Sequence, residues 1–76
     1  MDTLDALRLF VSIAEAGNLT AAARQESVAT STVTLALQQL EERVSARLIA
    51  RSTRKVTLAY EGEQFLIYAR RFLDEW

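Results

Sequence analysis

The sequence lacks the residues on which much protein chemistry depends. Its 76 residues include no cysteine, which excludes a disulfide framework and thiolate chemistry. They also include no histidine, the commonest general base and metal ligand. Proline is absent and glycine occurs only twice, so nothing in the composition indicates a linker or a low-complexity segment. These absences count against an enzyme, and we expect neither a metal site nor a cofactor.

Long apolar runs are absent too. No stretch approaches the roughly 20 residues that a helix needs to cross a bilayer. The N-terminus carries Asp2 and Asp5 where a secretory signal has a basic region. We therefore expect a cytoplasmic protein with one small hydrophobic core and no membrane partner.

Charge is distributed unevenly along the chain. The net charge is −1, whereas nucleic-acid-binding domains are often basic. However, residues 27–40 carry no charge of either sign, and residues 43–60 contain cations but no acid. These cations are Arg43, Arg47, Arg51, Arg54 and Lys55. A phosphate backbone responds to such a local basic segment more than to the net charge of the whole chain.

The first half of the chain predicts two helices and a tight connection. Apolar residues recur at helical spacing over residues 4–16, and Gly17 follows as a left-handed C-cap. A short second helix is expected over residues 20–26, with Thr20 as its N-cap. The connection to the next helix takes only residues 27–29.

A third helix is expected over about residues 31–44, capped by Thr30 or Ser31. One face carries an apolar stripe that we expect in the core: Val33, Leu37, Leu40 and Val44. The opposite face has no acid before Glu41 and carries Thr32, Thr34, Leu35, Gln38 and Gln39.

The last third of the chain predicts a hairpin and a fourth helix. Leu48 and Ile49 are expected to return to the core, residues 51–55 indicate a turn, and residues 56–58 alternate as a short strand does. The final helix begins near Tyr60. Its apolar residues form either intrachain core or a seam between two copies of the chain: Phe65, Leu66, Ala69, Phe72, Leu73 and Trp76.

Two helices joined by a tight turn and followed by a basic hairpin are typical of a winged helix-turn-helix. The major groove of B-DNA admits one helix, whose outward face must carry no acids, as the third helix does before Glu41. The N-termini of the second and third helices, at Thr20 and Ser31, could bind phosphates through free backbone N–H groups. Arg54 and Lys55 at the hairpin tip could enter the minor groove or bind its phosphates.

Residues 14–62 resemble the N-terminal domain of LysR-type transcriptional regulators. The matching motifs are Thr20 with Ala22 and Ala23, Leu40 with Glu41, Leu48 and Ile49 with Arg51, Thr53 to Lys55, and Gly62. The resemblance implies a mainly α fold, a winged helix-turn-helix with a three-helix core and a short β-hairpin wing, followed by a long linker helix. It implies a DNA-binding domain over residues 1–59 and a linker or dimerisation helix over residues 60–76.

The function implied is sequence-specific binding to double-stranded DNA in transcription regulation. Residues 31–44 would lie in the major groove, and the wing over residues 51–56 would lie at the minor groove or the backbone. The expected contacts are Thr20, Thr30, Ser31, Thr32, Thr34, Leu35, Gln38, Arg51, Thr53, Arg54 and Lys55. A homodimer through the linker helix is implied, and a small-molecule effector would act only through a C-terminal domain absent from this chain.

Several positions depart from the family pattern. The family often has glycine where Ser27 and Ser45 stand, so both turns must adopt positive φ without it. Leucine is usual where Glu26 stands, so the end of the second helix is expected to be exposed or frayed. A basic residue is frequent where Leu35 stands. We therefore expect Leu35 to contact a thymine methyl, with more of the readout coming from the DNA backbone and shape.

Two other classes of function stay open at this point. The basic run taken alone is typical of a solvated face, and the chain could be a helical interaction or dimerisation module that uses its last helix and binds no DNA. A gel shift with random genomic DNA distinguishes this module from a DNA-binding domain. An enzyme is disfavoured because neither a glycine-rich phosphate loop nor a metal-ligand cluster occurs in the sequence.

Overall fold

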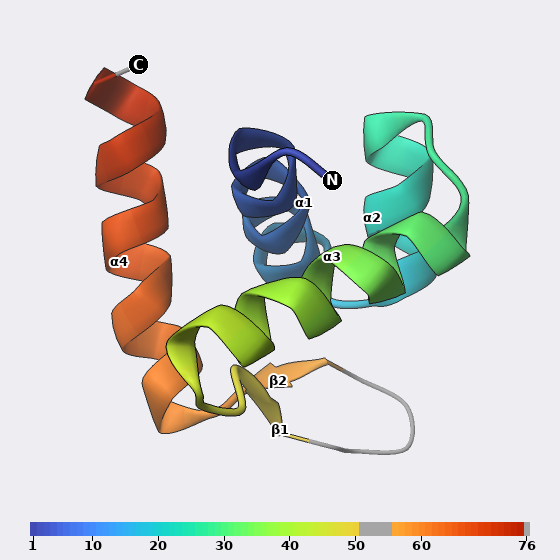
Figure 1. Ribbon diagram of the computed structural model, residues 1–76. Coiled ribbons are helices and arrows are strands. Elements are labelled where there is room, and N and C mark those ends of the chain that lie inside the picture. The colour runs from blue at the N-terminus through green and yellow to red at the C-terminus, as the bar shows by residue number, and fades with distance from the viewer. Residues whose placement is uncertain (51–55, 76) are drawn as a thin grey trace.

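The computed structural model describes residues 1–50 and 56–75. Along the chain it has α1 (Thr3–Ala16), α2 (Leu19–Glu26), α3 (Thr30–Val44), β1 (Ile49–Ala50), β2 (Thr57–Leu58) and α4 (Tyr60–Glu75). The fold is the predicted winged helix-turn-helix, with three helices, a short two-stranded hairpin and a long C-terminal helix (Figure 1). Arg51, Thr53, Arg54, Lys55 and Trp76 lie outside the described residues.

Helix α1 is the centre of the packing and contacts α2, α3 and α4 (Figure 1). Its apolar positions recur at helical spacing, which buries Phe10 and Ile13 completely in the core. Ala22 and Ala23 of α2 are also buried, and their small side chains allow a neighbouring helix to approach closely. Figure 1 shows α3 running from its N-terminal end beside α2 toward the start of α4, with the hairpin close to that end of α4.

The first three helices each end at a residue with left-handed backbone. Gly17 ends α1 with φ 82°, as predicted. Ser27 and Ser45 end α2 and α3 with φ 58° and 53°, so the prediction of positive φ without glycine is confirmed. At each serine, two backbone bonds close a Schellman motif. The wider bond of the pair at Ser27 runs from Val28 N to Ala23 O at 2.9 Å, and that at Ser45 runs from Ala46 N to Glu41 O at 3.2 Å.

The predicted N-caps of α2 and α3 are wrong. Asn18 is the N-cap of α2, and its Oδ1 accepts a hydrogen bond from Ala21 N at 2.7 Å, while Thr20 lies in the first turn. The N-cap of α3 is Ala29, which has no side-chain acceptor, and Thr30 is the first helical residue. Asn18 and Thr20 are both suitable N-caps, and Asn18 takes the position because its backbone is extended where the helix begins.

Two further expectations need correction. Val44, predicted in the core stripe of α3, is 38% exposed, and Ala36 is buried on that face instead. The end of α2 is ordered through Glu26, because the buried Ser12 hydroxyl donates to the Glu26 carboxylate at 2.7 Å. A hydrogen bond across α1 and α2 thus holds the position where the family pattern has leucine.

The hairpin is antiparallel, with Ile49 opposite Leu58 and Ala50 opposite Thr57. The sequence predicted the second strand and the return of Leu48 to the core, where Leu48 is fully buried. Just before β2, Val56 N donates to Gly17 O at 3.1 Å, which ties the hairpin to the turn between α1 and α2.

Helix α4 packs against α1. Phe65 contacts Phe10 edge to face, with ring centroids 5.4 Å apart, and Ala69 is 1% exposed. An ion pair between Arg70 and Glu15 spans 3.7 Å at the surface. None of the described helices is long and apolar enough to cross a membrane.

Candidate nucleic-acid interface

The outward side of α3 forms a shallow hollow of about 530 Å³. Its lining consists of five predicted DNA-contacting residues: Ser31, Thr32, Thr34, Leu35 and Gln38. Leu35 is 47% exposed, and Ser31 and Gln38 are exposed beside it. The fold therefore gathers on one helix surface the side chains that the sequence assigned to base contacts.

The opposite side of α3 holds this surface rigidly. Val33, Ala36 and Leu40 are buried, and α3 packs against both α1 and α2. A reading helix must be fixed on a scaffold so that its N-terminal half presents a constant geometry to base edges. The core residues of α3 meet that requirement without contacting a ligand themselves.

The N-terminus of α3 is open. Thr32 N and Val33 N both donate to Ala29 O, but no side chain within the described ranges caps the helix. An uncapped first turn presents backbone N–H groups and a partial positive charge. Because α2 is capped by Asn18 and α3 is not, the start of α3, with exposed Thr30 and Ser31, is the better of the two predicted phosphate sites.

The hydroxyl of Thr34 is already engaged. Its Oγ1 donates to Thr30 O at 3.2 Å, one turn back along the helix. The hydroxyl oxygen can still accept a hydrogen bond, but its proton is used within the helix.

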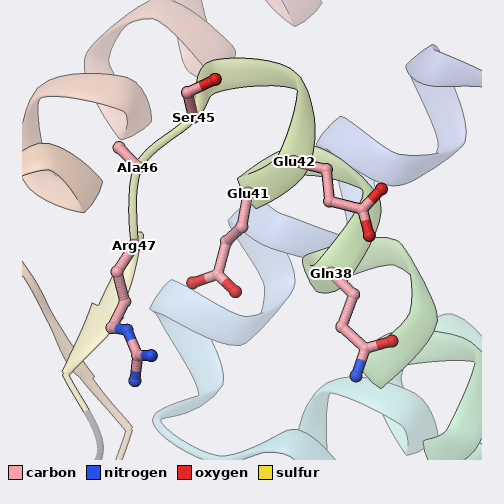
Figure 2. A pocket seen from close by; sticks show the side chains of 6 residues that line it. All are labelled: Gln38, Glu41, Glu42, Ser45, Ala46 and Arg47. Atoms are coloured by element: carbon pink, nitrogen blue, oxygen red, sulfur yellow. The ribbon is translucent and has the colours of Figure 1, made fainter.

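Acidic residues follow the uncharged outward side of α3 at the C-terminal end of the helix. A second hollow of about 430 Å³ is lined by Gln38, Glu41, Glu42, Ser45, Ala46 and Arg47 (Figure 2). The Glu41 carboxylate accepts a hydrogen bond from Leu48 N at 2.8 Å, so its charge is partly used inside the chain. Because Glu41 and Glu42 repel phosphates, the part of α3 suited to DNA ends at Gln38.

Leu48 connects α3, the hairpin and α4. Its N–H is bound by Glu41, its side chain is buried, and its carbonyl accepts a hydrogen bond from Ala59 N at 3.0 Å. A Cβ atom at Gly62 would overlap the Leu48 carbonyl oxygen. Glu41 and Gly62 belong to the family motifs, but their positioning role was missed because it depends on a carbonyl and an amide that residue types do not reveal.

Two arginines of the basic run, Arg43 and Arg47, lie within the described residues. Arg43 donates from Nη1 to Thr3 Oγ1 at 2.8 Å, at the start of α1. Arg47 is exposed in the loop before β1, where Figure 2 shows it beside Glu41. The four predicted wing contacts Arg51, Thr53, Arg54 and Lys55 lie outside the described residues.

The predicted dimer residues of α4 divide between core and surface. Ala69 is covered by its own chain, so it offers no surface to a second copy, and Phe65, Leu66 and Leu73 are half-buried against the core. Phe72 is 40% exposed. Other exposed apolar residues of α4, not predicted as contacts, are Tyr60, Ile67 and Tyr68.

Known proteins share both the sequence and the fold. A model of the family described as bacterial regulatory helix-turn-helix protein, lysR family, matches residues 4–63. The transcriptional regulator CrgA of Neisseria meningitidis is 38% identical over 69 residues, which is 91% of this chain but 23% of CrgA. The crystal structure of a CbnR DBD–DNA complex matches with a TM-score of 0.91 and 38% identity, over 97% of this chain and 84% of that one. A BenM DBD bound to catB site 1 DNA matches with a TM-score of 0.90 and 33% identity, over 99% and 80% of the two chains.

Proposed function

This chain belongs to the lysR family of bacterial regulatory helix-turn-helix proteins, and we propose that it is the DNA-binding domain of a transcription regulator. It spans about a quarter of the length of CrgA, so the proposal concerns DNA recognition. The family consists of regulatory proteins, in keeping with the expectation that the chain is not an enzyme.

We infer that α3 lies in the major groove with the exposed side from Thr30 to Gln38 toward the bases. The observation that carries this assignment is the hollow over Ser31 to Gln38, which is exposed, uncharged and next to an open helix N-terminus. Side chains of this kind satisfy base edges without repelling phosphates. The CbnR and BenM complexes with DNA, which have the same fold, support the assignment.

The wing supplies the second contact. We propose that Arg51, Arg54 and Lys55 neutralise phosphates or enter the minor groove, and that the Thr53 hydroxyl forms a hydrogen bond there, because this acid-free segment lies between the two strands of the hairpin. Thr20, in the first turn of α2, contributes a hydroxyl to the same backbone. Residues 1–59 then form the DNA-binding unit, and residues 60–76 the linker helix.

A gel shift with random genomic fragments tests the proposal. Binding at low salt is expected, with affinity falling at least about tenfold between 50 and 200 mM salt because bound phosphates release counterions. Arg54→Ala should weaken binding several-fold, whereas Arg8→Ala, a matched removal of an exposed arginine from α1, should not. If Arg54→Ala bound as tightly as the parent, the wing assignment would be wrong. A chain that binds no DNA at low salt yet still dimerises would be the interaction module instead.

We also propose that the chain forms a homodimer through α4. A hollow of about 320 Å³ between α1, α3 and α4 is lined largely by apolar atoms, with Tyr68 and Phe72 on its rim. Burial of such a patch in a second copy removes apolar surface from water. Sedimentation of Tyr68→Glu against the parent tests this: a dimer in the parent and a monomer in the variant are expected, and monomers in both would refute it.

The same proposal covers location and control. A regulator of this family must reach the chromosome, so we infer that it acts in the cytoplasm. A small-molecule effector, where one acts, would bind through a C-terminal domain outside these 76 residues.

A further inference from the structure

The outward side of α3 has an exposed leucine where the family pattern frequently has a basic residue. Leu35 is 47% exposed, and the hollow around it is mainly apolar. The hydroxyl proton of its neighbour Thr34 is donated to Thr30 O, one turn back along the helix. The centre of the surface is therefore suited to an apolar partner more than to a hydrogen-bonding one.

The absence of charge around Leu35 disfavours the commonest alternative, a guanine contact. Guanine is read in the major groove chiefly by arginine or lysine, through its O6 and N7 atoms. The uncharged stretch of residues 27–40 brings no such cation to this part of α3. Arg43, on the last turn of α3, is bound to Thr3 instead.

The major groove contains one apolar group on its base edges in unmodified DNA, the C5 methyl of thymine. We propose that Leu35 is a specificity-determining residue that packs on this methyl, so that α3 selects an A·T pair at the position it faces. The inference rests on the proposed function and names the base that the site reads. Burial of the Leu35 side chain against this methyl would favour thymine over the other bases without any charged contact.

Removal of single thymine methyl groups from the DNA tests this contact. Duplexes that bind the 76-residue chain are first selected from a random pool, and each thymine of the selected site is then replaced in turn by deoxyuridine. Deoxyuridine pairs identically and lacks only the methyl. Burial of one methyl is worth about fourfold in affinity, so a loss of about that size is expected at one thymine in each half-site.

Leu35→Ala identifies the side chain responsible. The variant should fold, because Leu35 is exposed and alanine favours helix, and it should bind thymine and uracil duplexes equally. Val44→Ala, which truncates an exposed aliphatic at the far end of the same helix, should keep the full uracil penalty. Circular dichroism of both variants verifies folding.

Each other result overturns the inference. A parent protein that tolerates uracil at every thymine, a Leu35→Ala variant that retains the penalty, or a selected site with no thymine at the contacted positions would exclude the methyl contact and leave DNA binding intact. Failure to bind any duplex at low salt would overturn the proposed function together with this inference.

Discussion

Replacement of Ser27 and Ser45 by glycine is expected to stabilise the protein. Both serines hold positive φ, at 58° and 53°, inside Schellman motifs that end α2 and α3. Left-handed backbone costs a residue with a Cβ about 1–2 kcal/mol. Glycine avoids that cost but loses about 0.5–1 kcal/mol more in chain entropy when it folds. The net gain should be about 0.5–1 kcal/mol for each substitution.

The assay is urea unfolding followed by circular dichroism, supported by thermal melts. A domain of this size gains roughly 4–8 °C in Tm per kcal/mol, so each variant should be resolved. Because the two turns use different hydrogen-bond partners, the double variant should gain about the sum of the single gains.

Two controls isolate the backbone as the cause. Ser27→Ala removes the hydroxyl but keeps the Cβ, so it should not stabilise. Ser31→Gly places glycine in the first turn of α3 and should lower the free energy of unfolding by up to about 0.5 kcal/mol. If both Ser27→Gly and Ser45→Gly left stability unchanged or reduced it, the inference of backbone strain at these turns would be refuted.

Three further substitutions test the packing that positions the interface, each by urea unfolding. Gly62→Ala should cost about 2–4 kcal/mol, because its Cβ would overlap the Leu48 carbonyl and force α4 away from the hairpin; a stability equal to the parent would contradict this close approach. Glu41→Ala should cost about 1–3 kcal/mol through loss of its bond to Leu48 N, and unaltered unfolding would show that the bond contributes nothing. Phe65→Ala should cost about 2–4 kcal/mol by removing the edge-to-face contact with Phe10, and a loss below about 1 kcal/mol would argue that α4 is not anchored there.

The helices were predictable from the sequence because their signals are local. Amphipathic spacing over residues 4–16 and the uncharged face of the third helix each lie within a few turns of one element, and the observed α1 and α3 follow them within one residue at the N-terminus. The hollow on α3 followed directly from that periodicity, since residues three and four apart share a helix face.

The caps show where local signals compete. Asn18 and Thr20 are both good N-caps, and so are Thr30 and Ser31. The observed N-caps are Asn18 for α2 and Ala29 for α3, because these are the last residues with extended φ and ψ before each helix begins. Residue type alone does not fix that boundary.

What the sequence by itself determined is the order of the elements, the left-handed turns and the set of uncharged side chains that share the outward side of α3, because each depends on residues close together in the chain. Tertiary structure alone decided which apolar residues of α4 are buried in the core. It also decided that Glu26 accepts a hydrogen bond from Ser12, and that Leu48 connects α3 to the hairpin and α4. These outcomes depend on which distant groups meet when the core forms. The connection at Leu48 is made by its backbone N–H and carbonyl, groups that residue type does not distinguish.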